Sequence, residues 1–492
     1  MDRMERIRAM LDAQDWAGAA AVLEQTDVQR LDWAGQDRAA EALAALPGET
    51  VRSSPLLNVR AAQLAAARGD NEALRRALLA LGALRERSRE DTPGRRRVEN
   101  LLSAASLLKE GTDNAQLLLT LSVMYNELQG QQPQAVFSAT GGRPSVLDGA
   151  QDLSHWGRNW KAVSSIVRPM LGALLPHGGR GAAEAACAEL LYLKNDLNGA
   201  ALQVSAAKSA PDPEIRFAGQ ALTARLHLLD GAARPPEELV EGMLRSIDEA
   251  GAGWLQAGAR AFAARLDVAR GRVQQAAAWA AGYEGDAFAR CTPRGAYVLQ
   301  TKAQVYLAAG RCREAAMLTE DLLLACPAGY TIRRVEYLLD GALACRRLGN
   351  EDAALDKVCA ALALAQPYGY VRLFADRAAP MQALLALAGR ARTLPDEQAA
   401  FLKKAAEAAA NMALLCPALY APPAAEAAPP ELTAAEAAVL QLLDQGKTNK
   451  EICEAMGIKL PTAKFHIHNL CEKLGAANRT AALAQAKKRG LL

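Results

Sequence analysis

The chain has 492 residues, which is too long for a single hydrophobic core, so several domains or an extended repeat array are expected. Hydrophobic residues make up 51% and aromatic residues only 5%, and the abundant Ala favours helices over strands, which predicts an all-α fold. The net charge is +3, no secretory signal opens the chain and no apolar run is long enough for a bilayer, so we expect a cytoplasmic location away from membranes. The nine cysteines contain no C-x-x-C pair, so we expect no bound metal.

The first predicted elements are helical hairpins, in which a Gly-containing turn joins two apolar helices. Segments with this pattern lie at residues 15–19, 68–73 and 197–200, at irregular spacing. A Gly in the left-handed conformation can end one helix and let the next one fold back. Each of these segments is therefore predicted to be a turn between two helices.

The pattern becomes periodic further along the chain. Gly271, Gly310 and Gly349 are 39 residues apart, and each lies between two apolar helical runs. An Ala stands seven residues before each Gly and another five residues after it: Ala264, Ala303, Ala342, Ala276, Ala315 and Ala354. Small residues at matched positions allow helices to pack closely. The period predicts a tetratricopeptide-like solenoid of helical hairpins, which we place at residues 1–415.

The solenoid at residues 1–415 is interpreted as a sensor or interaction domain, because such arrays present concave surfaces that bind peptides, proteins or small effectors. The alternative is a plain spacer. Trp156 and Trp160 are four residues apart in this region. They would either line a ligand pocket or, as is more common, form one core face of a helix.

A linker and a small basic domain follow the array. Residues 416–430 contain five prolines, which remove backbone donors and forbid a continuous helix, so a semi-rigid linker is predicted. From residue 431 onward nine basic residues stand against six acidic ones, whereas residues 1–430 hold 48 of each. The closing domain thus carries the whole net charge. Since Lys and Arg neutralise phosphates, this charge is of the sign that nucleic-acid binding requires.

Two capping boxes open the first two helices of residues 431–492. Thr433 and Glu436 have the S/T-x-x-E spacing, as do Thr448 and Glu451, in which a hydroxyl and a carboxylate satisfy exposed backbone N–H groups. A Gly ends each helix, at positions 446 and 457. Two further helices are predicted, one from about residue 461 to 474, since Pro is tolerated in a first turn, and one at residues 481–489.

The second and third helices form a helix-turn-helix, whose second member enters the DNA major groove. Four apolar residues at helical spacing are predicted to face the core: Ala463, Ile467, Leu470 and Leu474. The other face is predicted to contact base edges through Lys464, Phe465, His468 and Asn469. Lys450 and Thr462, at helix starts, are predicted to contact phosphates. The alternative is an ordinary solvated surface, which would expose the aromatic Phe465 without purpose.

An ordered series of residues runs through this domain. It comprises Leu432, Thr433, Glu436, Val439, Leu440, Gly446, Thr448, Asn449, Lys450, Glu451, Ile452, Thr462, Lys464, His466, Asn469, Leu470, Lys473, Leu474, Gly475, Asn478, Arg479, Thr480 and Ala482. The series resembles the LuxR-type helix-turn-helix. The resemblance implies binding to double-stranded DNA, usually as a homodimer through the last helix. Lys459 and Ala463 stand where the family commonly has a capping Ser and a Val, which predicts a less stable domain or an unusual DNA preference.

Segments of the array also resemble a known family. Residues 46–57, 361–374 and 380–385 are similar to the tetratricopeptide-like region of the MalT family of large LuxR regulators. In that family the array senses an effector or partner, and an ATPase module precedes it. Gly446-Lys447-Thr448 matches only the end of a phosphate-binding loop and joins two helices. We therefore expect no ATPase module and no cofactor.

These features predict a sequence-specific DNA-binding transcriptional regulator whose array senses a small-molecule or protein effector. The alternative is an interaction scaffold with a degenerate tail that no longer binds DNA, which the altered segment Lys459-Leu460 favours. An enzyme has little support, because no grouping of catalytic or metal-ligating residues is recognisable in the sequence.

Overall fold

The computed structural model describes residues 3–88, 92–109, 119–120, 122, 138–230, 236–282, 292–293, 295–420, 433–458, 460, 462–464, 466–467, 470, 479, 482–483 and 486. Over these residues the elements are α-helices and short 3-10 helices, with an isolated β-bridge between Asp148 and Asp152 and no strand. The all-α fold is confirmed. Within the same residues no helix combines the length and apolar character needed to cross a membrane. The chain divides into two compact units, Met1–Ala421 and Pro422–Leu492.

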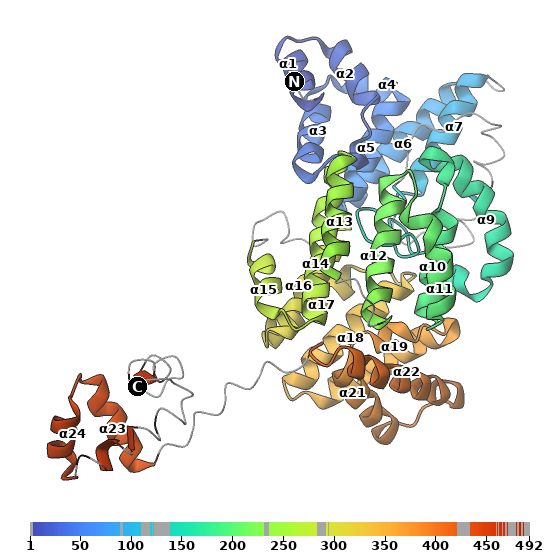
Figure 1. Cartoon of the computed structure of the whole chain (residues 1–492). Helices are drawn as coiled ribbons and strands as arrows, with labels where there is room; N and C mark the ends of the chain where they lie inside the picture. Colours follow the sequence, from blue (N-terminus) through green and yellow to red (C-terminus); the bar gives the residue numbers. More distant parts are fainter. Residues whose placement is uncertain are drawn as a thin grey trace. The chain divides into compact units, whose positions relative to one another are not determined.

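The amino-terminal helices of the larger unit are shown in blue in Figure 1. They are α1 (Arg3–Asp12), α2 (Trp16–Glu24), η1 (Val28–Arg30), α3 (Trp33–Ala45), α4 (Gly48–Ser53), α5 (Pro55–Arg68), α6 (Asn71–Arg87) and α7 (Pro93–Ser106). Asp15, Asp32 and Asp70 each accept a hydrogen bond from a backbone N–H in the first helical turn, which fixes the starts of α2, α3 and α6. A hydrophobic cluster that includes Ile7 and Leu23 forms the core of α1, α2, α3 and α5, whereas α6 and α7 pack into a larger cluster.

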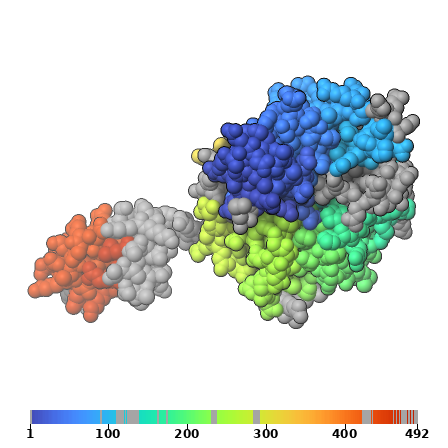
Figure 2. Space-filling view, turned by 90° about the horizontal axis from the view of Figure 1, so that it is seen from above, coloured from blue at the N-terminus to red at the C-terminus, as the bar shows by residue number. Residues whose placement is uncertain are grey.

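The middle of the larger unit contains the next group of helices. They are η2 (Ser154–Arg158), α9 (Trp160–Leu174), η3 (Pro176–Gly179), α10 (Ala182–Leu193), α11 (Leu197–Lys208), α12 (Pro213–Asp230), α13 (Pro236–Glu249) and η4 (Gly253–Leu255). The Arg30 side chain joins this group to the amino-terminal helices, because it pairs with Asp212 at 2.6 Å and lies over the Trp254 ring. Figure 2 shows the blue amino-terminal helices side by side with the yellow-green segment near residue 250.

The three early turns differ from the sequence prediction at two places. Gly69 takes φ +70° between α5 and α6, as predicted. Gly18 and Gly199, however, lie inside α2 and α11, where their N–H groups donate to the capping residues Asp15 and Asp196. The left-handed residues of these two turns are Gln14 and Asn195, with φ +59° and +67°. The prediction failed there because it assumed that only Gly makes such a turn, whereas Asn and some other polar residues also tolerate it.

The periodic region forms the predicted series of hairpins. Its helices are α14 (Gln256–Ala269), α15 (Val273–Ala281), α16 (Ala296–Ala308), α17 (Cys312–Ala325), α18 (Thr331–Arg347) and α19 (Glu351–Ala365). Gly271, Gly310 and Gly349 have φ between +74° and +81° and end α14, α16 and α18. The six matched Ala side chains, Ala264, Ala303, Ala342, Ala276, Ala315 and Ala354, are all buried. The 39-residue period is therefore confirmed as a repeated helical hairpin.

The larger unit closes with η6 (Gln366–Tyr368), α20 (Arg372–Ala375), α21 (Ala378–Ala391) and α22 (Asp396–Leu415). The chain stays packed against this unit beyond α22, since Cys416, Leu419 and Tyr420 are buried in its main hydrophobic cluster. Arg347 donates a hydrogen bond to the Tyr420 carbonyl oxygen. The unit therefore extends to Ala421, past residue 415, the predicted end of the array.

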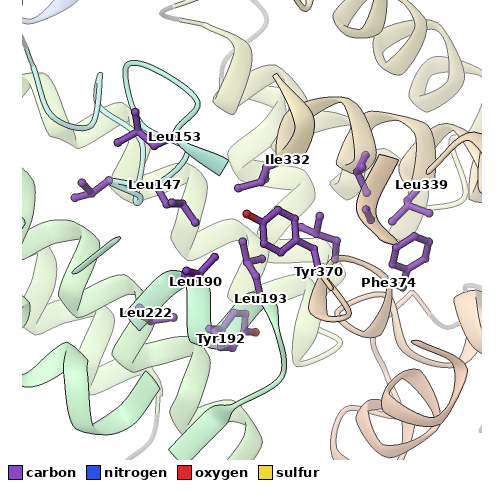
Figure 3. Close-up of a cluster of buried hydrophobic side chains, with 14 of the residues drawn as sticks. Leu147, Leu153, Leu190, Tyr192, Leu193, Leu222, Ile332, Leu339, Tyr370 and Phe374 are labelled. Carbon is purple, nitrogen blue, oxygen red and sulfur yellow. The ribbon is translucent and has the colours of Figure 1, made fainter. Parts of the chain in front are cut away.

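The main hydrophobic cluster brings together residues from distant parts of the larger unit. Figure 3 shows Leu147, Leu190 and Leu193 approaching Ile332 and Tyr370. Tyr370 is fully buried, and its hydroxyl donates to the Ser154 carbonyl oxygen. The start of η2 is thereby fixed against the segment that follows the repeats.

The smaller unit contains α23 (Ala434–Asp444) and α24 (Asn449–Met456). Both predicted capping boxes are present, at Thr433 and Glu436 and at Thr448 and Glu451. Gly446 and Gly457 take positive φ values of +77° and +65° after the two helices, as predicted.

Candidate nucleic-acid interface

The turn between α23 and α24 is fixed by the side chains of Glu451 and Arg479. The Thr448 backbone N–H donates to the Glu451 carboxylate at 2.7 Å, and this hydrogen bond is the largest cause that holds the pKa of Glu451 below its usual value. Arg479, from the fourth helical segment, donates to the Lys447 carbonyl oxygen at 2.9 Å. The start of α24 is thus held both by its own cap and by the following part of the domain.

The described residues from 460 to 470 are helical, so the third helix has begun by Leu460, one residue before the predicted start. Ala463 and Leu470 are buried with Ile452 and Val439 in one cluster, and Ile467 packs partly buried against it. The predicted core face is confirmed for these residues of the helix. Leu474 lies outside the described residues.

The predicted contact residues that the structure describes are all on the surface. Lys450 is the second residue of α24, and Thr462 and Lys464 lie on the third helix; all three are exposed. Phe465, His468 and Asn469 lie outside the described residues, as does Lys459. Lys464 is thus directed to solvent next to the buried Ala463, as a groove-facing residue must be.

Two features of this domain were not predicted from its sequence. Arg479 was noted only as part of the ordered series, whereas its side chain ties the turn at Lys447. It is also already helical, so the fourth helix begins earlier than the predicted residue 481. Of the described residues in this last segment, Ala482 and Ala486 are buried, four residues apart on one face. Arg479 and Lys447 are far apart in the sequence, so no local pattern marks their contact.

A second candidate site, in the larger unit, had no sequence signal. It is a cavity of about 150 Å³ whose lining includes Arg143, Arg265 and Tyr297. Trp156 and Trp160 do not line it. Instead Trp156 is buried in η2 and Trp160 is half-buried at the start of α9, both within the main hydrophobic cluster. Their packing supports the core alternative rather than the pocket.

Two family models match the chain. The model described as "MalT-like TPR region" matches residues 174–390, and the model described as "Bacterial regulatory proteins, luxR family" matches residues 430–486. The spore germination protein GerE of Bacillus subtilis is 40% identical over 63 residues, which are 13% of this chain and 85% of GerE. The chain belongs to the luxR family of bacterial regulatory proteins.

Other LuxR-type relatives match over the same small share of the chain. The quorum sensing-dependent transcriptional regulator RpaR of Rhodopseudomonas palustris is 48% identical over 61 residues, which are 12% of this chain and 25% of RpaR. The transcriptional regulatory protein LiaR of Bacillus subtilis is 43% identical over 61 residues, 12% of this chain and 29% of LiaR. The chain thus spans between a quarter and a third of the length of these two relatives. The two matched models agree with both resemblances found in the sequence.

Proposed function

We propose that this LuxR-family chain is a DNA-binding transcriptional regulator whose helical array senses an effector. The domain at residues 431–492 binds double-stranded DNA, and the array at residues 1–415, with its packed extension, controls that binding. The observation that carries the proposal is the LuxR-type domain itself, with two formed capping boxes and an exposed Lys464 beside a buried core face.

The contacts proposed for the DNA fall into two groups. Lys464, Phe465, His468 and Asn469 contact base edges in the major groove, which gives sequence preference. Lys450 and Thr462 contact phosphates, where a helix N-terminus already favours a negative charge. Lys450 and Thr462 are both exposed, so a phosphate can approach their side chains from solvent.

The proposed complex with DNA is a homodimer, as the resemblance to LuxR-type domains implies. Two domains related by a two-fold axis bind two half-sites about one helical turn apart, roughly 10 base pairs from centre to centre. Repeated selection of binding sites from a random duplex library with the full chain tests this. The expected result is an enriched palindrome with that spacing. Failure to enrich any sequence would overturn the proposed sequence-specific function.

A second candidate function is an interaction scaffold with a tail that does not bind DNA. The exposed Leu460, 46% accessible in a position that the family usually fills with a polar residue, favours it. An apolar side chain at the helix start would suit contact with a protein better than contact with a phosphate. The scaffold predicts that the full chain binds no duplex even at low salt, whereas the regulator predicts measurable binding there.

A further inference from the structure

The cavity of the larger unit lies where several distant segments meet. Its lining comes from the loop before η2 and from α10, α12, α14, α16, α18, α20 and α22. Leu147, Leu193 and Ile332 supply part of its apolar wall, and Figure 3 shows these side chains meeting from the loop, α10 and α18. An effector held here would contact both the middle helices and the repeat helices of the array.

Two guanidinium groups share one aromatic ring in this cavity. The Arg265 guanidinium lies 4.2 Å from the Tyr297 ring centroid, and that of Arg143 lies 5.3 Å from the same centroid. Arg143 is 4% exposed and Tyr297 6% exposed. Such cation–ring contacts hold both guanidiniums in place without neutralising their charge.

Both guanidiniums keep nitrogens that are not hydrogen-bonded. Nη1 of Arg143 and Nη2 of Arg265 are buried from solvent and have no hydrogen-bond partner within the described part of the chain. A buried donor without a partner is costly, and native proteins rarely leave one in a polar cavity without a functional reason. The two nitrogens are therefore candidate ligand contacts.

Of the two guanidiniums beside Tyr297, only that of Arg143 pairs with a described carboxylate. Asp148 pairs with Arg143 at 2.5 Å but also with Arg333 at 2.7 Å, so one carboxylate serves two guanidiniums. Arg265 donates through Nε to the Thr301 hydroxyl at 2.8 Å and forms no ion pair with any described carboxylate. The two guanidiniums beside Tyr297 thus have one directly paired carboxylate between them, although Glu336 also lines the cavity.

We propose that this cavity binds a small carboxylic acid, whose carboxylate accepts hydrogen bonds from Arg143 and Arg265 beside the Tyr297 ring. The proposal rests on the proposed function, in which the array senses an effector, and names the chemical class of that effector. A planar carboxylate matches the guanidinium fork and supplies the missing acceptors.

The size of the cavity limits the ligand. A cavity of about 150 Å³ is large enough for a molecule such as benzene, which indicates a ligand of about six to ten non-hydrogen atoms. Glu336, which also lines the cavity, offers an acceptor to a hydroxyl or ammonium group of the ligand. Inorganic phosphate shares the anionic chemistry but lacks the carbon skeleton that would fill the apolar wall.

Thermal unfolding and titration calorimetry of the full chain test the proposal. The probes are succinate, benzoate and inorganic phosphate, with succinamide and benzamide as neutral matches at constant ionic strength. We expect at least one carboxylate to raise the unfolding temperature in a saturable manner, while its amide does not. Equal effects of acid and amide, or binding of phosphate alone, would overturn the assignment of a carboxylate.

Variants of Arg265 complete the test. We expect Arg265→Gln to weaken carboxylate binding at least tenfold, because it removes the unpaired charge. Arg265→Lys keeps the positive charge but loses the planar guanidinium, so its carboxylate affinity is expected to lie between those of the wild type and Arg265→Gln. Partial binding by this variant would show that the loss in Arg265→Gln does not come from misfolding. Arg311→Gln is the matched control: Arg311 also lies over a tyrosine ring, that of Tyr306, but does not line the cavity. Undiminished affinity in both Arg265 variants would contradict the proposal.

DNA binding of the same preparations separates the two proposals. If the chain binds DNA but none of the carboxylates, the cavity inference fails and the regulator stands. If it binds a carboxylate but no DNA, the regulator fails and the cavity inference stands as a ligand site without its proposed output.

Discussion

Neighbouring side chains on the third helix of the LuxR-type domain have opposite surroundings, since Ala463 is fully buried and Lys464 is exposed. The helical period accounts for this contrast, because residues 463, 467 and 470 return to the same face. The face could therefore be predicted from sequence. The residues that contact DNA could not be established in the same way, because these contacts depend on the bound duplex. Three of the four proposed base-contacting residues also lie outside the described part of the chain.

Lys464→Ala is expected to reduce discrimination between a selected site and a mutated one. Each good contact to a base edge is worth about 1–3 kcal/mol, and removal of the Lys removes donors that only the correct base satisfies. Competition binding with single-base variants of the selected site measures the effect. His468→Ala is expected to act likewise. Unchanged discrimination in both variants would show that another face of the helix meets the bases.

Lys450→Ala is the matched comparison on the phosphate side. It is expected to weaken binding to all sequences alike and to lower the slope of log affinity against log salt by about one, since one phosphate contact is lost. Titrations at several salt concentrations measure the slope. A loss of affinity confined to one sequence would contradict the phosphate role.

Glu189 gives the larger unit a pH dependence. Burial is the largest effect and raises its pKa to about 7, although Val146 and Leu147 donate backbone hydrogen bonds to the carboxylate. The folded pKa lies above the ordinary value of 4.5, so the folded chain binds more protons between these values and stability falls as pH rises from about 4.5 to 7. Glu189→Gln removes the titrating carboxyl group and with it this pH-dependent contribution to stability.

The expected result is that the stability of the wild type relative to Glu189→Gln is higher at pH 5 than at pH 8. The difference is on the order of 2 kcal/mol, from the linkage between pKa and stability. Urea unfolding of both proteins across this range measures it. Parallel pH profiles would show that the carboxylate titrates as it does in the unfolded chain.

At the scale of elements, the helical hairpin is the unit that the sequence specifies best. The 39-residue period was predicted because a Gly at φ above +70° and an Ala at each matched position repeat in register. At the two early turns the left-handed residues, Gln14 and Asn195, were not predicted, because they carry no signal comparable to a Gly. The extension to Tyr420 was also missed, since the prolines of 416–430 indicate a linker but not the residue at which packing ends.

Gly271→Ala is expected to destabilise the larger unit more than Gly349→Ala. Both positions have positive φ, where a Cβ costs about 1–2 kcal/mol. At Gly271 an added Cβ would also lie 2.7 Å from the Ala418 Cβ, whereas nothing lies within 4 Å at Gly349. The overlap adds about 1 kcal/mol or more. Urea unfolding of the two variants gives the comparison, and equal midpoints would refute the contact with Ala418.

At the scale of the whole molecule, more of the LuxR-type domain than of the larger unit's cavity could be predicted from the sequence. The LuxR-type domain is specified by residues close together in the chain, so its caps, core face and family were predicted. The cavity is assembled from residues such as Arg143 and Arg265, which lie on separate elements and meet only at Tyr297. No local spacing marks that arrangement, so only the folded array shows it.

The most direct measurement is fluorescence anisotropy of the full chain on a labelled duplex of about 30 base pairs, which has room for two half-sites. A chain that ends at Ala421 serves as the control, because the two compact units separate there. The account predicts that the full chain binds, that affinity falls linearly on a log scale as salt rises from about 50 to 200 mM, and that the control does not bind. No binding by the full chain at the lowest salt, or equal binding by the control, would contradict it.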